Sequence, residues 1–285
     1  MKLALLASAL VVAGLGAAIW WGSMHWSAAT AQIVDRLRDR SDVRTPARSI
    51  SVKPVDDLPA PVARYFRYAL KEGQPPIRAT RITQAGELRA MDATKDGWKP
   101  FAATQYLSPQ SPGFVWDASI RMALLLPVRV RDAYADGEAS GQVSFLSLVT
   151  LAEERGTPEL NAGALHRYLA ESVWVPTALL PRAGLAWSPI DGNTALATLT
   201  DSQTTVSLEF RFSDAGEITS IYTPGRFAYL DGRYQLLPWE GHFRNYQERA
   251  AMRIPTEADV EWHLPSGRFP VWRGRIVDVE YELVR

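Results

Sequence analysis

The stretch VSLEFRF, residues 206–212, decides the fold, because every second side chain in it is apolar and those between are polar. A period of two is typical of a β-strand with one buried face and one wet face. The same alternation occurs over 114–121 and again over 277–283. The chain is therefore predicted to be mainly β.

Asp-Gly pairs separate these runs, and such pairs accept the positive φ of tight hairpin turns, which join antiparallel neighbours. They stand at residues 96–97, 136–137, 191–192 and 231–232. Helical apolar spacing appears over 59–72 and again over 158–172, where Thr157 can cap the helix. We expect an α+β protein with one large, curved antiparallel sheet of roughly nine or more strands, an open half-barrel with a few helices on its concave face.

The N-terminus carries an uncharged apolar run, Leu3–Trp21, preceded by Lys2. As a helix it would reach about 28 Å, close to the thickness of the hydrocarbon core of a bilayer. Trp20, Trp21 and Trp26 follow where an aromatic belt would lie. The run predicts a transmembrane helix over residues 3–21 that attaches the rest of the chain to a membrane.

A cleaved signal peptide is the alternative, since Ala29-Thr30-Ala31 has the small-x-small pattern of a cleavage site. The apolar run is longer than the roughly 7–15 residues of a signal core, which favours a retained anchor. The lone Lys2 resembles an export signal, whereas three arginines over 36–40 favour a cytoplasmic C-terminal side. We expect a single-pass protein of the bacterial inner membrane with a periplasmic soluble domain; with cleavage it would be a soluble periplasmic protein.

Three segments follow from these patterns: an anchor with its flank over 1–30, a solvated neck over 31–57, and one β-rich soluble domain over 58–285. The 31 Lys and Arg residues balance 31 Asp and Glu residues, which gives no electrostatic case for nucleic acid as a partner. The chain has no cysteine, so disulfides, thiolate metal ligands and thiol nucleophiles are excluded.

Catalytic signatures are missing from the sequence: there is no G-x-S-x-G, phosphate-binding loop, H-E-x-x-H or calcium loop. His242 and His263 could meet across neighbouring strands, but no third metal ligand can be named for them. We therefore predict no catalytic residues, no metal and no cofactor. A binding protein is favoured over an enzyme.

The C-terminal third concentrates aromatic, proline and arginine residues, which indicate strand ends and the rim of a sheet. Counting back by two from Val277, Arg275 and Arg273 continue the apolar face of the last strand. Arginines on such a face must reach a rim, pair with carboxylates such as Asp117 or Glu240, or meet an anionic ligand. The candidate ligand-binding residues are Trp116, Phe210, Trp239, Trp272, Arg273, Arg275 and Tyr281.

Five strings resemble a bacterial family of uncharacterised membrane-anchored proteins: LPAPVARY (58–65), PGFVWDA (112–118), WSPID (187–191), WEGHFRNY (239–246) and GRFPVWRGR (267–275). The likeness spans residue 58 to the C-terminus and implies no catalytic residue. At a coarser level the pattern is similar to the lipoprotein-carrier (LolA/LolB-like) half-barrel, which implies acyl chains or similar apolar ligands.

These observations favour a membrane-anchored envelope protein that binds a lipid-like or other apolar ligand in a half-barrel cavity. An envelope sensor or scaffold that binds a partner protein is one alternative, and its partner is unknown. A hydrolase built from Asp117, His242 and their neighbours is the other.

Overall fold

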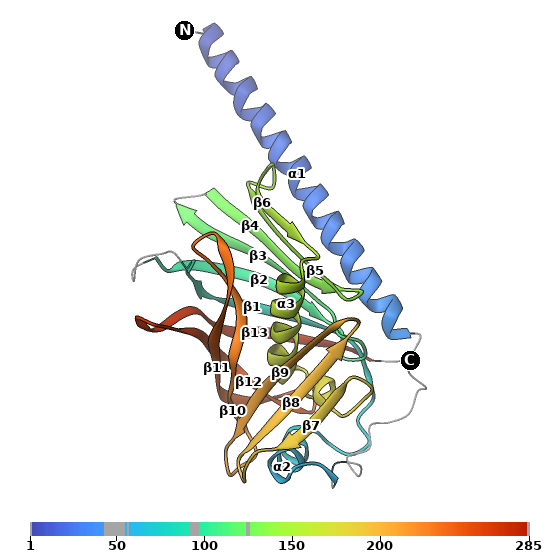
Figure 1. Ribbon diagram of the computed structural model, residues 1–285. Coiled ribbons are helices and arrows are strands. Elements are labelled where there is room, and N and C mark those ends of the chain that lie inside the picture. Colours follow the sequence, from blue (N-terminus) through green and yellow to red (C-terminus); the bar gives the residue numbers. More distant parts are fainter. Residues whose placement is uncertain (1, 43–54, 56, 92–96, 124–125, 284–285) are drawn as a thin grey trace.

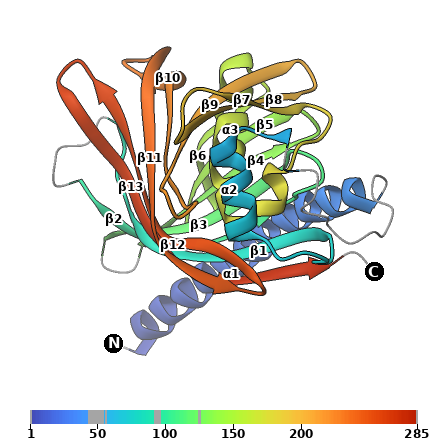
Figure 2. The ribbon, with the colours of Figure 1, turned by 90° about the horizontal axis from the view of Figure 1, so that it is seen from below.

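The computed structural model describes residues 2–42, 55, 57–91, 97–123 and 126–283. In this part of the chain thirteen strands form one antiparallel sheet that curls on itself, with three α-helices (Figures 1 and 2). The helices are α1 (Lys2–Asp42), α2 (Ala60–Ala69) and α3 (Pro158–Glu171), with short 3₁₀ turns η2 (Ser172–Trp174) and η3 (Pro176–Leu179). The mainly β prediction and the two helices expected near 59–72 and 158–172 are confirmed.

The strands run in two series that meet in the middle of the sheet. The order is β6-β5-β4-β3-β2-β1-β13-β12-β11-β10-β9-β8-β7, so the last strand pairs with the first and, among the described residues, β6 and β7 are the two edges. The bounds are β1 (Ile77–Leu88), β2 (Lys99–Leu107), β3 (Phe114–Ala123), β4 (Leu126–Ala135), β5 (Glu138–Phe145), β6 (Val149–Arg155), β7 (Leu185–Pro189), β8 (Thr194–Asp201), β9 (Thr204–Phe212), β10 (Ile218–Leu230), β11 (Arg233–Arg249), β12 (Met252–Leu264) and β13 (Gly267–Leu283).

Local sequence explains the turns and the helix ends. Asp136-Gly137 and Asp231-Gly232 have positive φ at all four residues and join β4 to β5 and β10 to β11. Thr157 accepts a hydrogen bond from the Leu160 amide and so caps α3, as expected.

Helix α3 connects the two edges of the sheet and contacts strands from both series, β4 and β5 on one side and β8, β9 and β10 on the other. Figure 2 shows α2 and α3 between the two arms of the curl. Because α3 has neighbours on both sides, its buried residues surround the helix: Gly163, Leu165, His166, Tyr168, Leu169 and Ala170.

Helix α1 continues well beyond the apolar run and packs on the face of the sheet opposite α3. Its Ile33, Val34 and Leu37 are buried against Val115 and Ala133, so the face of β3 expected to be wet is covered. A solvated neck was expected over 31–57, and for residues 31–42 this was wrong because they complete α1. Residues 43–54 and 56 of the expected neck lie outside the described residues.

A β-bulge in the last strand changes which face its side chains occupy. In the pairing of β13 with β1, Asp278 is opposite Thr83 but Ile276 is opposite the next residue, Gln84, so Val277 is extra. Ile276 is therefore buried, whereas Val277 is 51% exposed. The prediction that Arg273 and Arg275 continue the apolar face was wrong, because counting by two fails across a bulge.

Candidate ligand-binding cavity

The inner side of the curl encloses a cavity of about 400 Å³ between β1, β3 and β4 on one side and β10 to β13 on the other. The last turn of α3 and η2 also contribute to its wall. Apolar side chains make up most of the lining, and six of them are aromatic: Trp116, Trp174, Trp239, Phe243, Trp262 and Trp272. A volume of this size and character falls in the range of small-molecule sites.

The aromatic wall is held by contacts between rings from different strands. Trp239 and Trp262 are paired residues of β11 and β12, and their ring centroids lie 6.4 Å apart. Trp174 of η2 contacts Trp272 at 6.3 Å and Phe243 at 6.5 Å. The strand register and η2 thus bring these rings to one place.

Three of the seven candidate residues line this cavity: Trp116, Trp239 and Trp272. Phe210 is fully buried and packs on Trp187 at 5.0 Å, outside the lining. The Tyr281 hydroxyl, also outside the lining, donates to the Trp174 carbonyl at 2.9 Å and so fixes η2.

The two candidate arginines lie on the opposite face of the sheet. Arg273 pairs with Glu87 at 2.5 Å and is exposed. Arg275 is exposed beside it, in a shallow depression that also contains Arg244 and Glu257. Neither carboxylate named for them is their partner, because Asp117 pairs with Arg129 and Glu240 with Arg211.

Charged side chains, which were not among the residues predicted from the sequence, form one part of the cavity wall. Arg167 of α3 donates to Asp132 and to Glu171, each at 2.8 Å, and lies over the Trp116 ring at 4.9 Å. Burial acts to lower the pKa of Arg167, but the two carboxylates outweigh it and the pKa is raised. The available signal was the Arg167–Glu171 spacing of four on a helix.

Arg226 of β10 is the second partly buried arginine of the cavity. Its Nε and Nη2 donate to the Gly163 carbonyl at 3.3 and 3.0 Å, and its guanidinium lies 4.7 Å from the Trp239 ring centroid. Within the described chain it forms no ion pair. Burial, and then the nearby Arg167 cation, lower the pKa of Arg226 to about 10.

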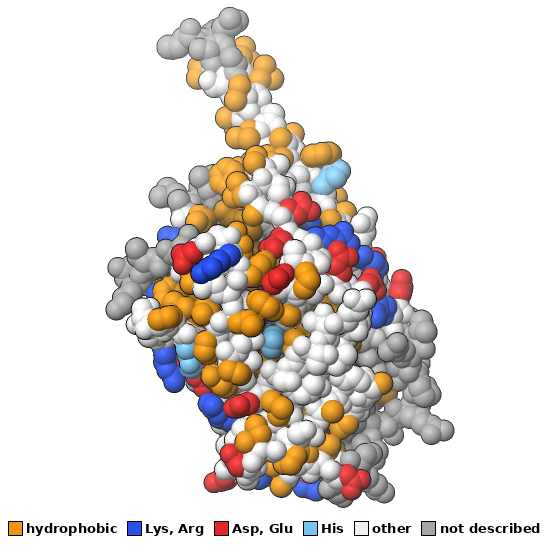
Figure 3. Space-filling view, in the orientation of Figure 1, with side chains coloured by type: hydrophobic (Ala, Val, Ile, Leu, Met, Phe, Trp, Pro, Cys, Tyr) orange, Lys and Arg blue, Asp and Glu red, His pale blue; other side chains and the backbone are white. Residues whose placement is uncertain are grey.

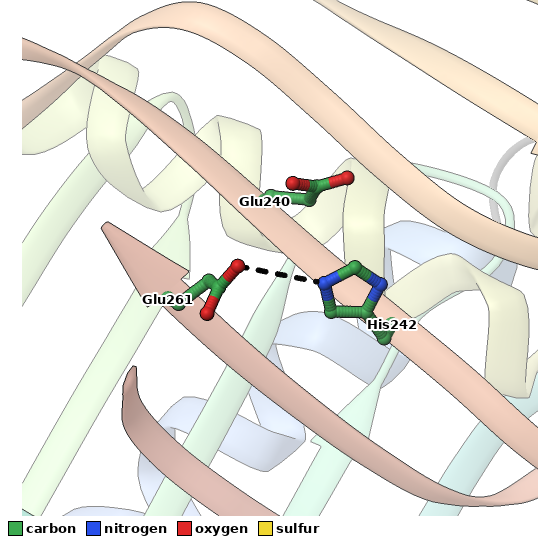
Figure 4. A group of neighbouring side chains, drawn as sticks. All are labelled: Glu240, His242 and Glu261. Carbon is green, nitrogen blue, oxygen red and sulfur yellow. Dashed lines mark ion pairs between the residues drawn. The ribbon is translucent and has the colours of Figure 1, made fainter. Parts of the chain in front are cut away.

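A second cluster of titratable groups lies on the other face of β11 and β12, since Glu240 and Glu261 alternate with the cavity tryptophans (Figure 4). His242 Nε2 is 3.7 Å from Glu261, and His263 Nε2 is 3.1 Å from Glu240. The two histidines expected to meet therefore flank a pair of carboxylates that the sequence did not suggest as ligands.

The cluster contains a set of atoms that could hold a metal ion, because ligand atoms of Glu240, His242 and Glu261 lie within 4.8 Å of one another. Arginines already neutralise both carboxylates, however. Arg211 pairs with Glu240 at 2.9 Å, and Arg268 reaches both glutamates. The geometry is that of a balanced ionic network that fixes the register of two strands.

Asp117 and His242, the pair named for a hydrolase, lie at different places. The Asp117 carboxylate accepts hydrogen bonds from Trp26 and Thr30 of α1 and from Arg129, at 2.7 to 3.0 Å. His242 is on β11 beside Glu261. Asp117 therefore attaches α1 to the sheet.

These features define a class of protein: an open, curled antiparallel sheet around an apolar cavity, with a long apolar helix at the N-terminus. The chain belongs to the family of unknown function DUF6920, whose model matches residues 56–281. The resemblance to an uncharacterised family is thereby confirmed. No curated protein matches the chain.

Two solved structures are similar in outline. The first is a LolA superfamily protein from Nitrosomonas europaea, at 11% identity and a TM-score of 0.42, covering 83% of this chain and 96% of that one. The second is a beta-barrel-like protein of the domain of unknown function DUF1849 from Brucella abortus, at 8% identity and a TM-score of 0.28, covering 73% of this chain and 99% of that one. Likeness at this level describes coarse shape and does not identify a ligand.

Proposed function

We propose that this protein is a membrane-anchored binding protein that holds a lipid-like or other apolar ligand in its cavity, with α2 and α3 covering the concave face of the sheet. The observation that carries the proposal is the cavity itself, about 400 Å³ and mostly apolar in its lining. Each methylene group that moves from water into such a site contributes about 0.8 kcal/mol.

A photoactivatable fatty acid tests this proposal. The full chain in lipid nanodiscs is irradiated with a diazirine-bearing hexadecanoic acid, and the labelled peptides are mapped by mass spectrometry. We expect labels on the cavity walls around Trp239 and Trp272, and their loss in Val260→Trp, which fills the cavity. The matched control is Val277→Trp, on the exposed face, which should label like the wild type. Labels confined to α1, or unchanged in Val260→Trp, would refute the site.

The first part of α1 supports the anchor. Among the described residues, α1 is the one helix that is long and apolar enough to cross a membrane, and its candidate span is Ser8–Arg40. Apolar side chains of its first turns stand open at the surface: Leu6, Leu10 and Val11 are 62–72% exposed. Such a surface is stable in hydrocarbon and unfavourable in water.

A retained helix is favoured over a cleaved signal by what the second half of α1 contributes to the domain. Cleavage after Ala31 would remove Trp26 and Thr30, which donate to the Asp117 carboxylate at 2.8–3.0 Å. Asp117 would then lose these donors at a site that is only 11% exposed. The intact mass of the protein purified from membranes tests this: we expect the full chain, and a species that begins after residue 31 would contradict it.

The three arginines over 36–40, which favoured a cytoplasmic domain, form ion pairs with carboxylates of the sheet. Arg36 and Arg40 pair with Asp136, and Arg38 with Glu282, so they serve to fix α1 on the sheet. This weakens the charge argument and leaves Lys2 as the topological signal. We propose that the domain lies on the non-cytoplasmic side. A C-terminal alkaline phosphatase fusion should then be active, and an inactive phosphatase with an active cytoplasmic reporter would reverse the orientation.

The end of the domain next to the span is also apolar. Around the point where α1 leaves the sheet, Figure 3 shows hydrophobic side chains at the surface; Met122, Val149 and Leu151 of the neighbouring strands are 50–58% exposed. Helix α1 and the turn between β5 and β6 are in close contact here, since a Cβ placed on Gly22 would lie 2.5 Å from the Ser147 carbonyl oxygen. We propose that this end rests against the lipid surface.

A further inference from the structure

In the charged part of the cavity wall, the carboxylates are not shared equally between the arginines. Both carboxylates there, Asp132 and Glu171, are held by the same arginine, Arg167. Arg226 lies close enough to Asp132 and Glu171 for their charges to act on it, but its hydrogen-bond acceptor among the described residues is the Gly163 carbonyl. Among the described residues, the cavity therefore contains one guanidinium, that of Arg226, which forms no ion pair.

The environment of Arg226 makes an anion favourable at this position. A guanidinium has five N–H donors, and one carbonyl cannot satisfy them. The rings of Trp239 and Trp262 lie 4.7 and 5.2 Å from its central carbon and supply only a weak counter-charge. Asp132 and Glu171 act on its charge but are already bound to Arg167, so this partly buried guanidinium keeps N–H donors for a ligand. A carboxylate or phosphate matches its planar fork.

The third arginine in the lining, Arg89, is already engaged. It donates to the Pro270 carbonyl at 2.5 Å and lies 4.0 Å from the Phe269 ring. Arg226 is therefore the cation with capacity for a ligand, and the tryptophans of the cavity surround it on the apolar side.

We propose that the ligand is an anionic amphiphile, an acyl chain with a carboxylate or phosphate head, and that Arg226 binds the head while the tryptophan wall binds the chain. This rests on the proposed function, and it replaces the exposed Arg273 and Arg275 with a partly buried cation in the cavity wall. The head gains charge-assisted hydrogen bonds, each of which is worth about twice a neutral one.

Competition against the photoactivatable fatty acid in nanodiscs tests the inference. The competitors are hexadecanoate, its methyl ester and monohexadecyl phosphate, and the proteins are the wild type, Arg226→Met and, as the matched control on the opposite face, Arg273→Met. Because partition into the bilayer is the same for every variant, it cancels when the acid-to-ester ratio is compared between proteins. We expect the preference for the acid over the ester in the wild type and in Arg273→Met to exceed that in Arg226→Met by about 10- to 100-fold.

The outcomes separate the two proposals. If no competitor displaces the probe from the cavity peptides, the proposed function fails. If the acid-to-ester ratio of the wild type equals that of an Arg226→Met protein that still takes up the probe, the function stands and the anion site is refuted. Arg226→Lys keeps the charge and should retain a preference. The competitor that weakens more between the wild type and Arg226→Met, the phosphate or the carboxylate, identifies which head the site takes.

Discussion

His166 should make the stability of the domain depend on pH between about 7 and about 5. It lies on α3 with 6% of its surface exposed, and its Nδ1 is 3.0 Å from the Ala162 carbonyl oxygen. Burial, and then the positive charge of Arg226, lower its pKa to about 4, although the Ala162 and Ser207 backbone acts in the opposite direction. The folded protein therefore holds a neutral imidazole at neutral pH.

The sign and size of the effect follow from linkage. The pKa falls from 6.5 in the unfolded chain to about 4 in the folded one, so between these values the unfolded state binds the extra proton. The stabilisation is complete above about pH 6.5 and is lost as the pH falls towards about 4. In full it amounts to about 3 kcal/mol, of which about 2 kcal/mol is lost between pH 7 and pH 5.

Urea unfolding of the full chain in detergent micelles at the two pH values measures this loss. Other groups titrate over the same range, so the loss of unfolding free energy between pH 7 and pH 5 is compared between the wild type and His166→Gln. This loss should be about 2 kcal/mol smaller in His166→Gln. His25→Gln, on the exposed part of α1, is the matched control and should behave as the wild type.

Arg226→Met offers an independent check, because removing that cation should raise the pKa of His166 and reduce the pH dependence. If wild type and His166→Gln lost the same stability on acidification, the reasoning about burial would be refuted.

Three further changes test other contacts. Trp26→Phe removes one donor to a carboxylate and should cost about 1.5–3 kcal/mol, seen as faster hydrogen exchange in the second half of α1; unchanged protection would contradict the attachment. Glu240→Gln, at a side chain only 6% exposed, should cost about 1–3 kcal/mol in urea unfolding, against less than about 1 kcal/mol for the exposed Glu257→Gln; equal costs would refute the network. The chain has no cysteine, so a polarity-sensitive fluorescent dye can be attached at a single introduced one. In nanodiscs its emission should shift to the blue on Val149→Cys but not on Ala60→Cys; equal spectra would place the end of the domain next to the span in water.

The sheet was predictable because its signals are local. A period of two and an Asp-Gly turn act over a few residues, and residues 206–212 form most of β9 as that pattern indicates. The bulge at Val277 carries no such signal, because it depends on pairing with β1, almost two hundred residues earlier in the chain. One inserted residue was enough to move Arg273 and Arg275 to the other face.

The second half of α1 shows how charge can mislead when partners are distant in sequence. Arginines interleaved with aspartates over residues 35–40 are typical of a solvated segment, and no sustained apolar period marks them as helical packing. In the structure their partners are Asp136 and Glu282, and the apolar contact needs only Ile33, Val34 and Leu37. A short apolar stripe of three residues is enough to pack a helix on a sheet when the rest of the helix and its ion pairs hold the stripe in place.

The cavity was predictable in its aromatic wall but not in its charges. Trp116 stands on a strand whose alternation faces it inward, whereas Trp239 and Trp272 were named from the density of aromatic residues in the C-terminal third. Counting by two would have placed Trp272 on the outer face, and the bulge at Val277 brings it inward. Arg167 stands on α3, which contacts strands on two sides. The apolar stripe in the sequence of α3 predicts one buried face of the helix and not the second one, which carries Arg167. Arg226 follows a register shift between Thr223 and Arg226, so its direction cannot be counted along the strand. An arginine placed inward at such an irregularity, with both nearby carboxylates bound elsewhere, is consistent with a site for an anion.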